Sequence, residues 1–136
     1  MNQPSLHTSN STPPRQFQLA PLLQKSKDSY LLWHTYFKLI PKEHRFSLGV
    51  KIDNIFIEII EMISGALYIK KEERALYIKV AIRKTDTLKL FFLILWETKP
   101  LDNKKYLAIS EKIDEIGRML GGWLGQTTKQ NSSIKR

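Results

Sequence analysis

Two pairs of carboxylates have the spacing that acid–base catalysis or metal binding would need. Glu58 and Glu61 are three residues apart, and so are Glu111 and Asp114. Side chains three positions apart project from the same face of a helix, so either pair could exchange a proton or bind a divalent cation. A small metal-dependent enzyme is therefore one interpretation. On a solvated helix, however, the same pairs are ordinary surface charge, which is the simpler interpretation.

The other residues that commonly carry catalysis are few or wrongly spaced. His7, His34 and His44 form no His-x-x-x-His or Glu-x-x-His pair, and no serine lies in a nucleophile elbow. No glycine-rich segment continues into the Lys and Ser or Thr of a phosphate-binding loop. The sequence contains no cysteine, which excludes disulfides, thiolate catalysis and cysteine-bound zinc or iron–sulfur clusters. We expect a protein without catalytic activity, metal or cofactor.

Basic side chains are more numerous and better organised than these groups. The 136 residues include 22 Lys and Arg against 13 Asp and Glu, a net charge of +9 that favours an anionic partner. No motif that reads bases is present, so we expect RNA or DNA to bind through its phosphates without strong sequence preference. A charged face that is merely solvated is the alternative. The expected nucleic-acid contacts are Lys42, Arg45, Lys51, Lys70, Lys71, Arg74, Lys79, Arg83, Lys84, Lys104 and Lys105.

Four helices must position these side chains. Hydrophobic residues at three- and four-residue steps predict helices over residues 21–40, 46–69 and 72–98, and a fourth from an N-cap at Asp102 to about Leu124. Short links between them favour an all-α, antiparallel up-down four-helix bundle. In that topology the first and third links lie at the same end. Lys42 and Arg45 would therefore meet Lys99, Lys104 and Lys105 there.

The segments outside the bundle are polar. Residues 1–20 are rich in Ser, Thr, Asn, Gln and Pro, and residues 126–136 are polar and basic, so we expect a disordered N-terminal arm and a disordered C-terminal tail around a bundle of residues 21–125. The longest apolar run is far shorter than the roughly 20 residues of a membrane-spanning helix, and no targeting segment is apparent. We expect a cytoplasmic protein without membrane contact.

Two features suggest self-association. Residues Leu90–Trp96 are apolar all round, which indicates cover on both sides by other chains or by a fully enclosing bundle. Gly117, Gly121 and Gly125 are four residues apart, a smooth face that lets another helix approach closely, within the bundle or between subunits. Alternatively, Gly121-Gly122 simply ends the helix. The expected subunit-interface residues are Leu90, Phe91, Phe92, Leu93, Trp96, Gly117, Gly121, Gly122 and Trp123.

Two motifs carry a family resemblance. The first is Pro41-Lys-x-x-Arg45-Phe-Ser-Leu-Gly49, and the second is Ile116-Gly-Arg-Met-Leu-Gly-Gly-Trp-Leu124. With four helices in this order, residues 21–125 resemble the accessory variability determinant proteins of diversity-generating retroelements. These belong to a wider four-helix-bundle family that includes proteins encoded in intervening sequences of large ribosomal RNA genes.

The resemblance implies a ring-like homopentamer without catalysis. It also implies that the protein binds the retroelement's reverse transcriptase and template RNA or cDNA, and so supports mutagenic reverse transcription. The third helix departs from the family pattern: Thr85-Asp-Thr-Leu-Lys89 stands for Leu-Asp-x-Leu-Arg, and Leu93 stands where a further Arg is usual. The alternative function is that of the ribosomal intervening-sequence proteins, with an unknown partner.

Overall fold

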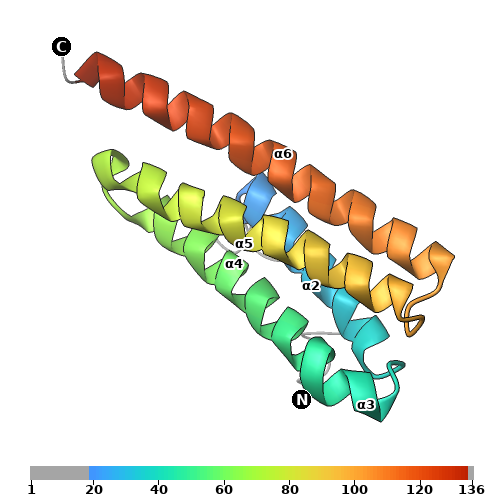
Figure 1. Ribbon diagram of the computed structural model, residues 1–136. Coiled ribbons are helices and arrows are strands. Elements are labelled where there is room, and N and C mark those ends of the chain that lie inside the picture. The colour runs from blue at the N-terminus through green and yellow to red at the C-terminus, as the bar shows by residue number, and fades with distance from the viewer. Residues whose placement is uncertain (1–18, 135–136) are drawn as a thin grey trace, which may run out of the picture.

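The helices pack as the up-down bundle that the sequence predicts. The computed structural model describes residues 19–134. It contains α2 (Pro21–Phe37), α3 (Lys42–His44), the π-helical turn η2 (Arg45–Gly49), α4 (Val50–Tyr68), α5 (Lys71–Glu97) and α6 (Asn103–Ile134). The order and packing of these elements confirm the all-α four-helix bundle (Figure 1).

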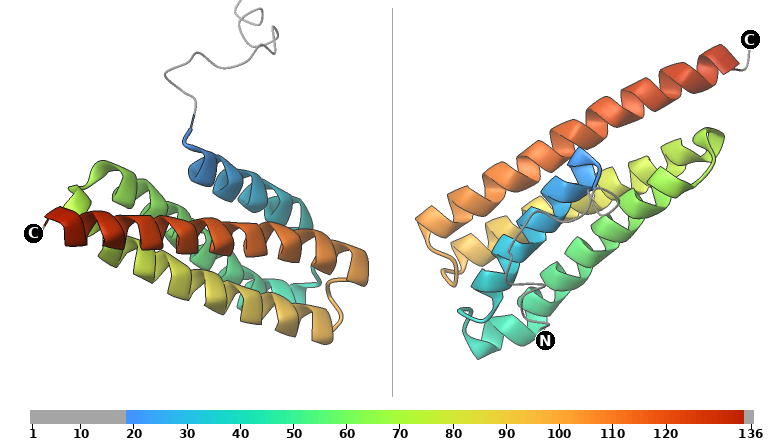
Figure 2. Two further views of the ribbon diagram at one scale, coloured as in Figure 1. Left: turned by 90° about the horizontal axis from the view of Figure 1, so that it is seen from above. Right: turned by 180° about the vertical axis from the view of Figure 1, so that it is seen from behind.

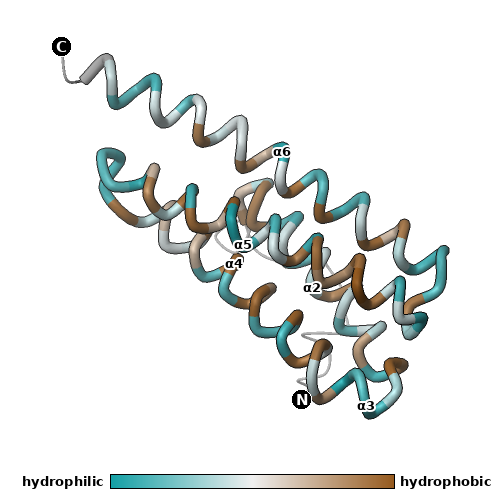
Figure 3. The backbone as a smooth tube through the Cα atoms, in the orientation of Figure 1, coloured by the Kyte–Doolittle hydropathy of each residue, from teal (hydrophilic) through white to brown (hydrophobic). Residues whose placement is uncertain are grey.

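Each long helix packs against two others. Helix α5 lies between α4 and α6, and α2 lies between α4 and α6 on the opposite side (Figure 2). The α2–α4 link and the α5–α6 link meet at one end of the bundle, which we call the link end (Figure 1). Hydrophobic residues recur along each helix, whereas the α4–α5 link at the other end is hydrophilic (Figure 3).

Aromatic rings fill the centre of the bundle. The Trp33 ring meets the Phe92 ring edge-on at 5.3 Å between centroids, and Phe92 meets Phe56 edge-on at 6.2 Å. Edge-to-face pairs of this kind stabilise the folded state by more than the burial of their apolar area alone would. Phe92 is only 1% exposed within the single chain, so its expected place in a subunit interface is wrong. An apolar run does not by itself reveal which of its side chains face the core.

Helix α6 is longer than the sequence suggested. It was expected to end near Leu124, but it continues to Ile134, so residues 126–134 are helical rather than a disordered tail. Thr127 is only 2% exposed, which shows that the first of the added turns still packs on the bundle. Extending an existing helix gains one hydrogen bond per residue without a new nucleation step. Gly121-Gly122 therefore does not end the helix, and residues 1–18 and 135–136 of the expected tails lie outside the described residues.

The first link begins earlier than predicted and is itself partly helical. Helix α2 ends at Phe37, and α3 and η2 carry the helical path almost directly into α4. Within residues 19–134, no helix combines the length and the apolar character needed to cross a membrane.

Candidate nucleic-acid and partner interface

Two of the eleven expected nucleic-acid contacts are arginines whose side chains bind backbone carbonyls within the same chain. Arg45 donates from Nε to the Ile40 carbonyl at 3.0 Å and from Nη2 to the Lys38 carbonyl at 3.1 Å. These carbonyls follow the end of α2, where no helical partner remains for them. Arg45 therefore fixes the α2–α4 link.

Arg74 does the same at the other end of the bundle. It donates from Nε to the Ala66 carbonyl at 2.6 Å and from Nη2 to the Ile69 carbonyl at 3.4 Å. Its guanidinium carbon lies 5.9 Å from the centroid of the Trp123 ring, within cation–π range. Arg74 thus ties the end of α4 to α6.

Two of the expected lysines are held by carboxylates. Lys84 Nζ lies 3.0 Å from Glu58 Oε1, which joins α5 to α4. Lys105 Nζ lies 3.1 Å from Asp102 Oδ2, and the Lys105 backbone N–H donates to Asp102 Oδ1 at 2.9 Å. The second bond confirms Asp102 as the N-cap of α6. These bonds from the Lys105 backbone and side chain hold the pKa of Asp102 below its ordinary value.

The other seven expected contacts are exposed. Within the described part of the chain, none of them forms an ion pair. They fall into three groups: the link end with the nearby start of α4, the middle of α5, and the α4–α5 link. In that order, the groups are Lys42, Lys51 and Lys104; Lys79 and Arg83; and Lys70 and Lys71.

The link end carries excess positive charge, as its topology predicts. Residues 38–49 and 97–105 contain six Lys and Arg against three Asp and Glu. Lys38 and Lys99 add exposed cations there beyond the predicted contacts. Lys99 has a backbone φ of 80°, so it takes the left-handed conformation that directly follows the end of α5.

The carboxylate pairs lack the surroundings of a metal site. Glu58 is bound to Lys84, and Asp114 Oδ1 lies 3.5 Å from Lys89 Nζ, while Glu61 and Glu111 are exposed. Among the side chains that the structure describes, no three His, Asp or Glu residues lie close enough to hold a metal ion. The arrangement therefore gives the metal-dependent enzyme no support.

Only one side of the expected apolar belt is accessible. Leu90 is 52% exposed, Phe91, Leu93 and Trp96 are partly exposed, and Phe92 belongs to the core. A hollow of about 280 Å³ lies between α5 and α6, with Leu90, Leu93 and Tyr106 among its lining residues. The exposed side chains and this hollow form a surface that a neighbouring helix could cover.

Three of the four glycines of α6 face away from the bundle. Within the described residues, a Cβ atom on Gly121, Gly122 or Gly125 would meet no atom of another helix within 4 Å, whereas one on Gly117 would lie 3.3 Å from Lys89 Nζ. Close packing inside the bundle therefore does not explain Gly121 or Gly125. Trp123, which was also expected at the interface, lies partly buried beneath Arg74.

An exposed apolar stripe along η2 and α4 was not recognised in the sequence. Phe46 and Tyr68 are 67% and 83% exposed, and Val50 and Ile57 lie exposed between them. The spacing of these four residues does place them on one helix face. The apolar stripe was missed because the neighbouring faces of the helix are polar and together indicate a single polar side. Their residues are Lys51, Asn54, Glu58, Glu61 and Gly65.

Comparison with known protein families places this fold in a family. A sequence model described as bAvd-like matches residues 22–127, which is most of the chain and nearly all of the bundle. No curated protein and no solved structure matches the chain.

Proposed function

Because the chain belongs to the bAvd-like family and is thus an accessory protein of the Avd type, we propose that it serves a diversity-generating retroelement without catalysing a reaction itself. It binds the element's reverse transcriptase and the template RNA or cDNA in the cytoplasm. It does so as a homo-oligomer, and the family resemblance implies a pentamer. Its role is to support mutagenic reverse transcription.

The exposed cations of α5 carry the nucleic-acid part of this proposal. Lys79 and Arg83 are one helical turn apart and exposed, and in the described part of the chain neither has an ion-pair partner. Cations without an internal partner can displace the counterions of a phosphate backbone at little loss to the fold. Lys42, Lys51, Lys70, Lys71 and Lys104 extend the positive surface along the molecule.

Self-association rests on exposed apolar and glycine surface. The side chains of Leu90, Phe91 and Leu93 line the accessible side of the belt, and Gly121 leaves the α6 backbone open to a neighbour. The exposed apolar stripe along η2 and α4, from Phe46 to Tyr68, supplies a further apolar face that fits a protein partner such as the transcriptase.

The salt dependence of nucleic-acid binding tests the role of α5. Each phosphate contact contributes about −0.9 to the slope of log affinity against log salt on duplex and about −0.7 on single strands. Changing Lys79 and Arg83 together to Ala should flatten this slope by about one to two units. Changing Lys27 and Lys112 to Ala removes the same charge from α2 and α6, and should have a smaller effect.

Two results would count against the proposal. An unchanged slope in the Lys79 and Arg83 variant would assign these cations to solvation or to a protein partner. The genome offers an independent check, because a reverse-transcriptase gene beside this one with near-identical template and variable repeats is expected. Their absence would favour a protein of the ribosomal intervening-sequence type.

A further inference from the structure

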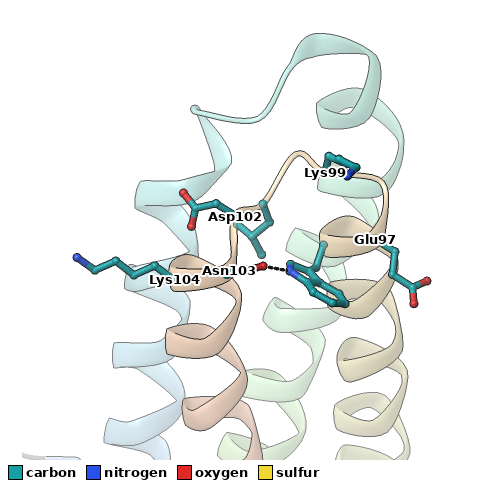
Figure 4. A pocket seen from close by; sticks show the side chains of 7 residues that line it. Glu97, Lys99, Asp102, Asn103 and Lys104 are labelled. Carbon is teal, nitrogen blue, oxygen red and sulfur yellow. Dashed lines mark hydrogen bonds between the residues drawn. The ribbon is translucent and has the colours of Figure 1, made fainter.

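A pocket opens at the link end, beside the connection between α5 and α6. Its volume is about 840 Å³, and it is open to solvent. It combines an aromatic side chain with basic and acidic groups around the rim (Figure 4). The lining residues are Trp96, Glu97, Lys99, Leu101, Asp102, Asn103 and Lys104.

The indole of Trp96 is held in one orientation. Its Nε1–H donates to Asn103 Oδ1 at 2.6 Å, the dashed bond in Figure 4. Its ring also stacks on Tyr106 with 5.1 Å between centroids and 18° between planes. A ring fixed by two contacts loses little conformational freedom when a ligand packs on it.

The charges at the rim suit a phosphodiester chain that passes the ring. Lys99 and Lys104 are exposed, and within the described residues neither has a carboxylate partner. Asp102 is already bound to Lys105 and to the start of α6, so its charge is largely offset. Glu97, the other acid, projects to the opposite side of the pocket from Lys104 (Figure 4).

We propose that this pocket binds single-stranded RNA or DNA by stacking a base on Trp96, with the neighbouring phosphates at Lys99 and Lys104. The inference rests on the proposed nucleic-acid function and adds a preference for single strands. Bases in a duplex are already stacked on each other, whereas an unpaired base offers its face to an aromatic side chain. Stacking tolerates any base, which agrees with the lack of a sequence-reading motif.

This assignment separates Trp96 from the proposed subunit interface. Trp96 lies in the last turn of α5, and its indole N–H and ring are engaged with Asn103 and Tyr106 of α6. Leu90 lies nearly two turns earlier, on the exposed side of the belt. A base can therefore occupy the pocket while Leu90 and Gly121 contact another subunit.

The experiment measures fluorescence anisotropy of a labelled 12-nucleotide DNA, as a single strand and as a duplex, over a series of salt concentrations. Trp96→Ala should weaken single-strand binding about 5- to 150-fold, as expected for loss of one stacked base, without changing the salt slope or duplex binding. Trp96→Phe keeps an aromatic face and should bind almost as the wild type. The wild-type tryptophan emission should be quenched by the single strand, and Trp96→Phe should lose most of that quenching.

Several outcomes would overturn the inference. One is single-strand affinity that is unchanged in Trp96→Ala, and another is quenching that persists in Trp96→Phe. A loss of affinity that accompanies a smaller assembly would place Trp96 in the subunit interface instead. If Trp96→Ala does not fold, the emission of Trp96→Phe still decides.

The proposed function is judged by a different variant. If Trp96→Ala binds like the wild type while the Lys79 and Arg83 variant flattens the slope, stacking fails and the proposed function stands. If stacking is seen but the Lys79 and Arg83 variant keeps its slope, the proposed role of α5 fails and the pocket stands.

Discussion

The Tyr30 hydroxyl on α2 donates a 2.9 Å hydrogen bond to Asp53 Oδ1 on α4. The same oxygen accepts the indole N–H of Trp33 at 3.2 Å, and Trp33 is fully buried. Burial raises the pKa of Tyr30, and the hydrogen bond to Asp53 and the charge of Asp53 raise it further. The Asp53 carboxylate on α4 thus binds two aromatic side chains of α2.

Removing this carboxylate should destabilise the bundle far more than removing one donor. Asp53→Ala leaves the buried Trp33 N–H without its acceptor and should lower the free energy of unfolding by about 2–3 kcal/mol. Tyr30→Phe loses one hydrogen bond and should cost about 1 kcal/mol. Urea denaturation followed by circular dichroism measures both, with the exposed Asp28→Ala as a control. Equal effects of Asp53→Ala and Asp28→Ala would refute this role for Asp53.

The cap of α6 should make stability depend on pH in acid. The folded-state pKa of Asp102 lies below its ordinary value of 3.8, so its stabilisation is complete above that value and is lost as pH falls through the folded pKa. At neutral pH, Asp102→Ala should lower the melting temperature, and Asp102→Asn should lower it less because Asn also caps helices. The difference between wild type and Asp102→Asn should vanish once the pH lies below the folded-state pKa of Asp102. If the melting temperatures still differ at that pH, the charge of Asp102 is not the cause of the difference.

The helices could be predicted because their burial follows a simple period. Ile52, Ile59 and Ile63 recur on one face of α4 and are all buried in the core. Asp102 was likewise recognisable as a cap, since an acidic residue directly before a helical pattern has few other local roles. Both patterns involve residues that are close together in the sequence, so they can be recognised without knowledge of the tertiary structure.

The fate of each cation could not be predicted, because it depends on contacts across the fold. Counting charges treats Arg74 and Arg83 alike, yet Arg74 binds the end of α4 and stacks on Trp123 while Arg83 is exposed. Phe92 shows the same limit for apolar runs, since only the packing of Trp33 and Phe56 decides which side is inside.

Lys99 should be replaceable by glycine with a gain in stability. Its φ of 80° places a residue with a Cβ atom in the left-handed region, directly before Pro100. Glycine adopts this conformation without steric strain and commonly follows a helix end. Lys99→Gly should raise the free energy of unfolding by about 0.5–1 kcal/mol in urea denaturation. The control Lys112→Gly, at an exposed position inside α6, should instead destabilise by a similar amount. A loss of stability in Lys99→Gly would show that the lysine side chain contributes packing that outweighs the strain.

Gly121 should separate the stability of one chain from the assembly of several. In the part of the chain that the structure describes, no atom of another helix lies within 4 Å of a Cβ placed there. Gly121→Leu therefore fits the single bundle and should stabilise α6 by about 0.8 kcal/mol through helix propensity. In an assembly whose subunits approach through this face, the same side chain overpacks the contact, at a cost of about 1–3 kcal/mol. Light scattering should therefore report a wild-type particle several times the 15.9 kDa chain mass and a smaller one for Gly121→Leu, while circular dichroism reports equal or greater helicity. Gly121→Ala, which adds little volume, should keep the larger particle. A monomeric wild type would refute self-association. A Gly121→Leu variant that assembles normally would exclude this face from the interface, and the belt at Leu90 or the stripe from Phe46 to Tyr68 would then be the surface to examine.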